Sequence, residues 1–258
     1  MIAEREKLMC FMLQARIGST RLPGKMILPF FKEKNILQLI IEKLKKCFPN
    51  IPIVLATSIE SSNDALETLG TDLGCLVYRG SENDVLSRFI EAGNKFNFSH
   101  IIRVCADNPF LDVKEMQHLI KFAKGNSQYD YVAFKVNNEP SIITHFGFWA
   151  ELVTLEALQR IDSMTKETLY HEHLTNFIYK NVELFEIKYL PVSPVLEGRN
   201  DVRMTLDTFA DFELLSEIYG QLYLKYGNQF CIDEIIIFLD SNPDYKREMT
   251  VQINNNSK

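Results

Sequence analysis

The amino-acid sequence predicts an α/β protein with a mostly parallel sheet that helices cover on both faces. Short apolar runs recur along the chain, and amphipathic segments of helical period separate them. The runs are apolar at nearly every position, which is typical of strands buried on both faces. Hydrophobic residues make up 46% of the 258 residues, enough for a sizeable core.

The expected elements follow one another as strand and helix. Strands are predicted at 8–13, 53–56, 75–78, 100–105, 129–134 and 202–206. Helices are predicted at 35–48, 63–73, 84–96, 113–124, 212–226 and 232–239. Asn63, Asn83 and Asp112 stand where helix N-caps are expected.

The alternation breaks at Lys135, where the segment to residue 200 mixes strand and helix patterns without regular βα units. We expect a substrate-covering subregion at 135–200 within a single domain that spans residues 1–245. Residues 246–258 are expected to form a polar tail whose last five residues are disordered.

Composition argues against several classes of protein. The formal net charge of −6 disfavours a large basic surface for nucleic acid. No apolar stretch approaches the roughly 20 residues of a membrane-spanning helix, and the charged start does not resemble a secretory signal. The five dispersed cysteines, with no Cys-x-x-Cys pair, fit a reducing compartment. We therefore expect a cytoplasmic protein with neither nucleic acid nor a membrane as partner.

The loop after the first predicted strand is the most informative segment. Residues 13–26 combine two glycines, two small hydroxyl residues and the three cations Arg16, Arg21 and Lys25. In open α/β sheets, ligands bind where strands end. Glycines let backbone amides approach a ligand, and these amides together with Lys and Arg neutralise phosphates. The loop is therefore predicted to bind a triphosphate.

Other interpretations of this loop fit less well. A P-loop requires four residues between its glycines and a hydroxyl residue after the lysine. Here five residues separate Gly18 from Gly24, and Met26 follows Lys25. No Gly-x-Gly-x-x-Gly fingerprint occurs in the loop. A basic surface loop with a Pro-Gly turn is the remaining alternative.

Two aspartates are predicted to end strands beside this loop. Asp107 and Asp207 each stand four residues after an arginine, at the ends of the 100–105 and 202–206 runs. Mg²⁺ commonly takes one or two carboxylates and completes its shell with water and phosphate oxygens. Alternatively, each aspartate caps the following helix. Asp211 is interpreted as a helix-start residue, with a supporting role left open.

These motifs resemble those of the sugar-activating cytidylyltransferases, in the branch named for spore coat polysaccharide synthesis and related to enzymes that make CMP-Kdo. The 13–26 string resembles the family's signature loop. Residues 105–109 and 205–207 resemble its Thr-Ala-Asp-Asn-Pro-like and Thr-Val-Asp-like motifs, and 54–58 and 78–89 resemble nucleotide-pocket segments. The resemblance implies a Rossmann-like three-layer nucleotidyltransferase fold and a homodimer, with residues 135–200 contributing to dimerisation.

The resemblance also implies roles for individual residues. The implied catalytic residues are Arg16, Lys25, Asp107 and Asp207, with Asp107 and Asp207 as Mg²⁺ ligands. The implied nucleotide-binding residues are Gln14, Ala15, Arg16, Gly18, Ser19, Thr20, Arg21, Lys25, Thr57, Ser58, Arg79, Gly80, Ser81 and Ala106. The implied acceptor-binding residues are Asn108, Glu151, Glu172 and His173.

The acceptor half departs from the family pattern at two positions. Trp149 stands where relatives often have aspartate, and His171 replaces an arginine. His171 and His173, with His145, could in principle hold zinc. The segment is predicted to be helical, however, and residues two apart do not share a helix face.

The resemblance implies transfer of CMP from CTP to an acidic sugar, giving a CMP-sugar and pyrophosphate for surface polysaccharide or glycoconjugate synthesis. Alternatives are transfer to a sugar phosphate or phosphonate to give a CDP-linked product, or use of another base. A third alternative is a non-catalytic CTP-binding scaffold or regulator.

Overall fold

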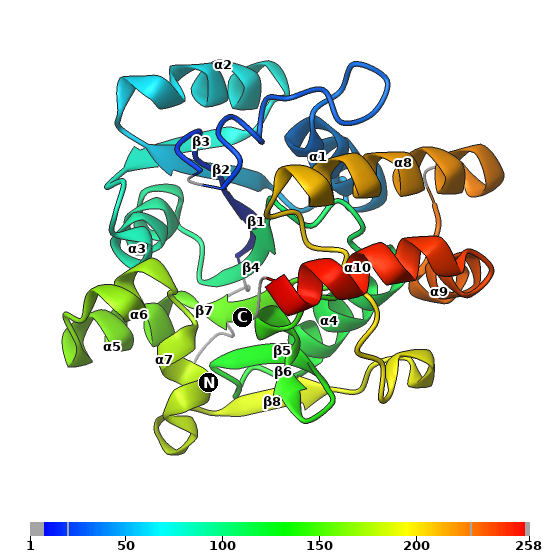
Figure 1. Ribbon diagram of the computed structural model, residues 1–258. Helices are drawn as coiled ribbons and strands as arrows, with labels where there is room; N and C mark the ends of the chain where they lie inside the picture. Colours follow the sequence, from blue (N-terminus) through cyan, green and yellow to red (C-terminus); the bar gives the residue numbers. More distant parts are fainter. Residues whose placement is uncertain (1–7, 20, 228, 256–258) are drawn as a thin grey trace.

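The computed structural model describes residues 8–19, 21–227 and 229–255, which fold around one eight-stranded sheet (Figure 1). The strands are β1 (Met9–Gln14), β2 (Ile53–Ser58), β3 (Leu76–Gly80), β4 (His100–Cys105), β5 (Tyr131–Val136), β6 (Glu139–Pro140), β7 (Glu151–Thr154) and β8 (Ile187–Leu190). Their order is β3-β2-β1-β4-β7-β5-β6, with β8 paired to β5. The pairs β1–β2, β1–β4, β2–β3 and β5–β8 are parallel, whereas β7 runs antiparallel between β4 and β5.

Helices cover both faces of the sheet, which makes the fold three-layered and Rossmann-like (Figure 1). One face carries α1 (Ile36–Cys47), α2 (Asp64–Asp72), α4 (Val113–Gly125), α8 (Phe209–Tyr226), α9 (Ile232–Asp240) and α10 (Pro243–Asn255). The other carries α3 (Val85–Phe96), α5 (Leu155–Met164), α6 (Thr168–Glu172) and α7 (Asn176–Lys180). Short 3₁₀ turns are η1 (Ser61–Asn63), η2 (Ser141–Ile143), η3 (Val182–Leu184) and η4 (Pro194–Leu196).

Both faces of β1 are buried, which explains why residues 9–13 are all apolar. Phe11 and Leu13 enter the core under α1, while Cys10 and Met12 enter the core under α3. Gln14, the last residue of β1, pairs with Ala56 of β2 and Cys105 of β4. The carboxyl ends of these three strands therefore lie level with one another, and the loops that follow them meet at one edge of the sheet.

The predicted strands and helices of the first half are confirmed with small shifts in their ends. Asp112 caps α4, since its Oδ1 accepts hydrogen bonds from the backbone N–H groups of Lys114 (2.7 Å) and Glu115 (3.0 Å). The cap of α3 is Asp84 rather than Asn83. Asn63 precedes α2, but its side chain accepts a hydrogen bond from the Ile17 N–H (2.9 Å) and so fixes the β1 loop instead.

Residues 202–206 are extended but do not form the predicted strand. Met204 N–H donates to the carbonyl of His145 (2.8 Å) and Leu206 N–H to that of Asp107 (3.0 Å). Both acceptors lie in loops, so no ladder develops. The segment instead carries Asp207 through the core to the sheet edge where Asp107 lies.

The structure adds detail to two expectations about organisation. Within residues 135–200, β6, β7 and β8 are strands of the sheet. Most of the expected polar tail forms a helix, α10, whose Met249 is fully buried. Of the five residues expected to be disordered, Asn254 and Asn255 lie in this helix, and 256–258 lie outside the described residues. Tyr245, Met249, Val251 and Ile253 are scattered through an otherwise polar segment, which was too weak a signal to predict that packing.

Glu115 gives the fold a testable pH dependence. Burial, reinforced by Asp112 and Asp233, raises the pKa of Glu115 from 4.5 to about 7. Between these pH values the folded state binds more protons than the unfolded state, so stability falls as pH rises. At pH 8 the free energy of unfolding of Glu115→Gln should exceed that of the wild type by up to about 3 kcal/mol, and the gain should vanish below pH 4.5. Urea denaturation at the two pH values would measure the difference.

A matched control is Glu156→Gln, which changes an exposed glutamate in the first turn of α5. This variant should show no gain that disappears on acidification. Equal pH profiles for the two variants would contradict the assignment to Glu115.

Candidate active site

Two cavities adjoin at the carboxyl edge of β1 and β4, with volumes of about 460 Å³ and 360 Å³. The smaller cavity is lined by the β1 loop, including Arg16, Ser19 and Lys25. The larger extends toward η2 and α7. The residues lining both are Arg21, Arg103, Cys105, Asp107, His173 and Asp207. Ligands in the two cavities would meet at this common wall.

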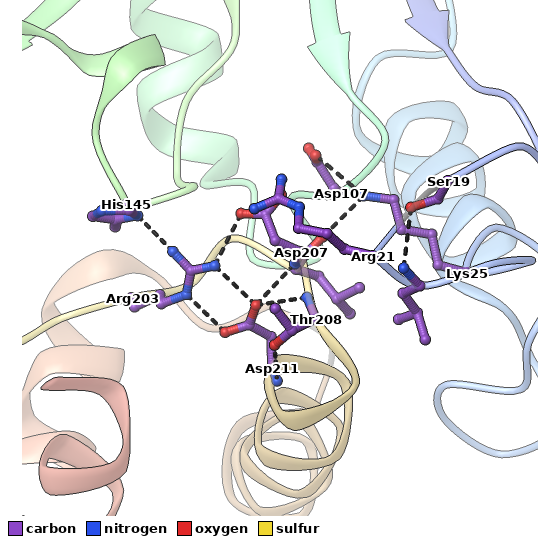
Figure 2. Close-up of polar contacts among 11 residues, drawn as sticks. Ser19, Arg21, Lys25, Asp107, His145, Arg203, Asp207, Thr208 and Asp211 are labelled. Atoms are coloured by element: carbon purple, nitrogen blue, oxygen red, sulfur yellow. Dashed lines mark hydrogen bonds and ion pairs between the residues drawn. The ribbon is translucent and has the colours of Figure 1, made fainter. Parts of the chain in front are cut away.

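The β1 loop is held by its own backbone and by buried side chains. Gly24, at φ +73°, donates its N–H to the Ile17 carbonyl (3.2 Å), and Leu22 and Met26 are buried in the core. These contacts direct Lys25 into the smaller cavity. Its Nζ donates to the Leu206 carbonyl (3.0 Å) and lies 3.5 Å from Oδ2 of Asp107 (Figure 2).

Asp207 lies in a chain of ion pairs that crosses the site (Figure 2). Arg21 contacts its Oδ1 at 2.8 Å, and Arg203 contacts its Oδ2 at 2.9 Å. Arg203 also binds Asp211 through Nε (2.7 Å) and Nη2 (2.9 Å), and its Nη1 lies 2.6 Å from Nδ1 of His145. The buried Arg203 and Asp211 thus fix the position of Asp207, which together with Arg21 faces both cavities.

Asp211 starts α8 as predicted, and it also has the supporting role that was left open. Its carboxylate accepts the backbone N–H groups of Asp207 (3.0 Å) and Thr208 (2.8 Å), which completes the capping box of α8. Burial opposes its charged form, but hydrogen bonds from Arg203 and the backbone outweigh burial and lower the pKa of Asp211. Asp211 therefore positions Asp207 as well as starting the helix.

The β1 loop also contacts the end of α6. Nη1 of Arg16 lies 3.7 Å from Oε1 of Glu82, and its Nη2 lies 3.6 Å from Oε1 of Glu172. Glu172 lines only the smaller cavity, whereas His173 lines both. The structure thus places Glu172 on the predicted nucleotide side rather than the acceptor side.

Of the remaining predicted nucleotide residues, Gln14, Ala15 and Ala106 line the smaller cavity, and Gly18 lies beside Glu82. Thr20 lies outside the described residues. The β2–β3 group lines neither cavity; it comprises Thr57, Ser58, Arg79, Gly80 and Ser81. Arg79 is held by Glu67 (2.5 Å), Asp64 (2.7 Å) and the Ser58 carbonyl (2.9 Å), and Ser81 Oγ accepts the Asp84 N–H.

On the predicted acceptor side, Asn108 lines the larger cavity but Glu151 does not. Glu151 is buried and accepts hydrogen bonds from Arg103 (2.6 Å), Thr175 (2.9 Å) and Tyr131. Its place in the cavity wall is taken by Arg103, which was not among the predicted site residues. The sequence signal that could have revealed this role is an arginine within the otherwise apolar run of β4.

A family model described as Cytidylyltransferase matches residues 10–234. The chain belongs to the cytidylyltransferase family. The spore coat polysaccharide biosynthesis protein SpsF of Bacillus subtilis is 32% identical over 249 residues, covering 92% of this chain and 96% of SpsF.

Two solved structures show how far the cytidylyltransferase fold is shared. A cytidylyltransferase from Leptospira borgpetersenii superposes with a TM-score of 0.82 at 27% identity, covering 93% of this chain and 97% of that one. The CMP:2-keto-3-deoxy-manno-octonic acid synthetase complexed with CTP superposes with a TM-score of 0.60 at 16% identity, covering 83% of this chain and 98% of that one. The second likeness concerns the fold alone.

The residues of this cytidylyltransferase fit a magnesium ion that is shared with a ligand. Among the described residues, no three His, Cys, Asp or Glu side chains are grouped so as to hold a metal by themselves. Asp107 and Asp207 face both cavities, beside two cations that would neutralise phosphates. Two carboxylates completed by phosphate and water oxygens are a usual Mg²⁺ set.

Two of the three histidines considered for zinc have protein partners, whereas His173 lines both cavities. His171 lies 2.9 Å from Asp84 and 3.0 Å from the Thr165 carbonyl, and His145 contacts Arg203.

In the described part of the chain, no helix is long and apolar enough to span a membrane.

Proposed function

We propose that this protein is a Mg²⁺-dependent nucleotidyltransferase that transfers CMP from CTP to a Kdo- or nonulosonate-like sugar acid. The observation that carries the proposal is the pair of adjoining cavities with Asp107, Asp207 and Arg21 in their common wall. Such a wall brings a nucleotide and an acceptor together at one phosphorus atom. Similarity to SpsF favours a product used in surface polysaccharide synthesis.

The smaller cavity suits the triphosphate. Lys25, Arg21 and Arg16 place three fixed positive charges there, and Ser19 adds a hydroxyl. Phosphoryl and nucleotidyl transfer depend on positioning and charge neutralisation rather than on a covalent intermediate. The cations would therefore orient the α-phosphate and stabilise the charge that develops on the departing pyrophosphate.

The larger cavity suits the acceptor. The acceptor hydroxyl oxygen forms a bond to the α-phosphorus, the bond from that phosphorus to the bridging oxygen breaks, and pyrophosphate leaves. The hydroxyl proton passes to solvent. Asp107 and Asp207 would hold Mg²⁺, which when bound polarises the phosphate and lowers the pKa of a nearby hydroxyl.

Pyrophosphate release tests the proposal. CTP, UTP, ATP and GTP would each be offered with Mg²⁺ and a panel of sugar acids and sugar phosphates. We expect release with CTP and a 2-keto sugar acid, with loss in Asp107→Asn. Release only with a phosphorylated acceptor would instead indicate a CDP-linked product, and CTP binding without turnover would indicate a scaffold or regulator.

A further inference from the structure

Several residues that line the larger cavity carry buried polar atoms that the protein leaves without partners. Among the described residues, five lining residues each carry a buried nitrogen or oxygen that makes no hydrogen bond. These atoms are Arg103 Nε, Asn108 Oδ1, Trp149 Nε1, Asn176 Oδ1 and Thr205 Oγ1. Buried polar atoms are normally paired. Their concentration around one cavity indicates a polar ligand.

Arg103 is the cation in this set, and its orientation is fixed from one side. Nη1 donates to Oε1 of Glu151 (2.6 Å) and to Oγ1 of Thr175 (3.3 Å). Within the described part of the chain, neither Nε nor Nη2 makes a hydrogen bond. Those two nitrogens form one edge of the guanidinium group, which matches the two oxygens of a carboxylate.

Glu151 neutralises the charge of Arg103 only in part. The same carboxylate accepts hydrogen bonds from Thr175 (2.9 Å) and Tyr131, so three donors share its negative charge. Burial alone would lower the pKa of Arg103, but attraction to Cys105 and Glu151 outweighs burial and raises it. A permanently charged, oriented guanidinium group therefore lines the cavity.

We propose that Arg103 binds the carboxylate of the acceptor, an assignment that rests on the proposed transfer reaction and specifies how its substrate is selected. The neighbouring Asn108 and Thr205 pair with acceptor hydroxyls. Trp149, stacked on Phe134 with ring centroids 5.9 Å apart, supplies an apolar wall and an N–H donor. The site thus selects a sugar acid over its neutral counterpart.

Trp149 is the only tryptophan of the chain, so its fluorescence reports directly on this cavity. The wild-type protein would be titrated with 3-deoxy-octulosonate, N-acetylneuraminate and their methyl esters. We expect a fluorescence change with at least one acid and at least tenfold weaker binding of its ester. Equal binding of acid and ester, or no binding of either acid, would overturn the proposal. This comparison needs no variant.

Arg103→Lys tests the residue itself, because lysine keeps the charge but cannot bind a carboxylate through two parallel hydrogen bonds. Acid binding should weaken tenfold or more, with CTP binding unchanged. The control is Arg160→Lys, which changes an arginine 3.0 Å from Asp130 and outside both cavities. It should leave both affinities unchanged.

Turnover separates this assignment from the transfer reaction. If a sugar acid binds in a way that depends on Arg103 but no pyrophosphate is released, the proposed CMP transfer is refuted and the carboxylate site is supported. Pyrophosphate release by Arg103→Lys with an unchanged acceptor KM would refute the site and keep transfer. A raised KM for CTP alone would assign Arg103 to the nucleotide phosphate and overturn the proposal.

Discussion

Replacing Lys25 with alanine should lower kcat for pyrophosphate release by about 10²–10³-fold, the usual effect of removing one preorganised donor from a site of developing charge. Lys25 is well oriented for this role. Its side chain is only 12% exposed, and the Leu206 carbonyl holds Nζ 3.5 Å from Asp107. Alanine removes the cation from the smaller cavity without altering the backbone of the loop. Steady-state kinetics with saturating CTP would measure the loss.

Stability should change little in this variant. Asp107, the carboxylate left behind, is one-third exposed and keeps its contact with water. The matched control is Lys34→Ala, which removes a lysine paired with Glu42 at 2.7 Å on the surface. Normal activity in Lys25→Ala, or an equal loss in both variants, would contradict the assignment of Lys25 to the triphosphate.

The sequence predicted the fold, and it predicted that Asp107 and Asp207 would lie near the β1 loop, because both predictions depend on local patterns. Buried strands, amphipathic helices and the loop after the first strand are each readable within about fifteen residues. Asp107 and Asp207 are one hundred residues apart, yet each follows an apolar run, and both were expected at the strand ends. The structure places them at the common wall of the two cavities.

Roles that depend on distant partners could not be read in this way. Arg79 was expected at the nucleotide, but Asp64, Glu67 and the 58–60 backbone occupy its guanidinium group. Glu151 and Arg103 face each other across β7 and β4, and this pairing decides which of them borders the cavity. Antiparallel insertion of β7 has no local sequence signal.

Replacing Asp211 with alanine should lower the free energy of unfolding by about 3–5 kcal/mol, the usual cost of removing one partner from a buried ion pair. Arg203 is 1% exposed and would keep its charge without its two-point partner. The N–H groups of Asp207 and Thr208 would also lose their acceptor. Urea denaturation would measure this loss. The control Asp201→Ala, on a partly exposed pair with Arg199 (3.5 Å), should cost less than about 1 kcal/mol.

A double variant separates the structural from the catalytic contribution of this ion pair. Replacing Arg203 with methionine and Asp211 with leucine removes both buried charges at similar volume, so stability should exceed that of Asp211→Ala. Activity should stay low, because Asp207 loses the Arg203 contact at 2.9 Å and the backbone hydrogen bond that position it. Recovered activity together with recovered stability would show that Asp207 needs no such support. Recovered stability alone would show that the buried charges are retained to position the carboxylate.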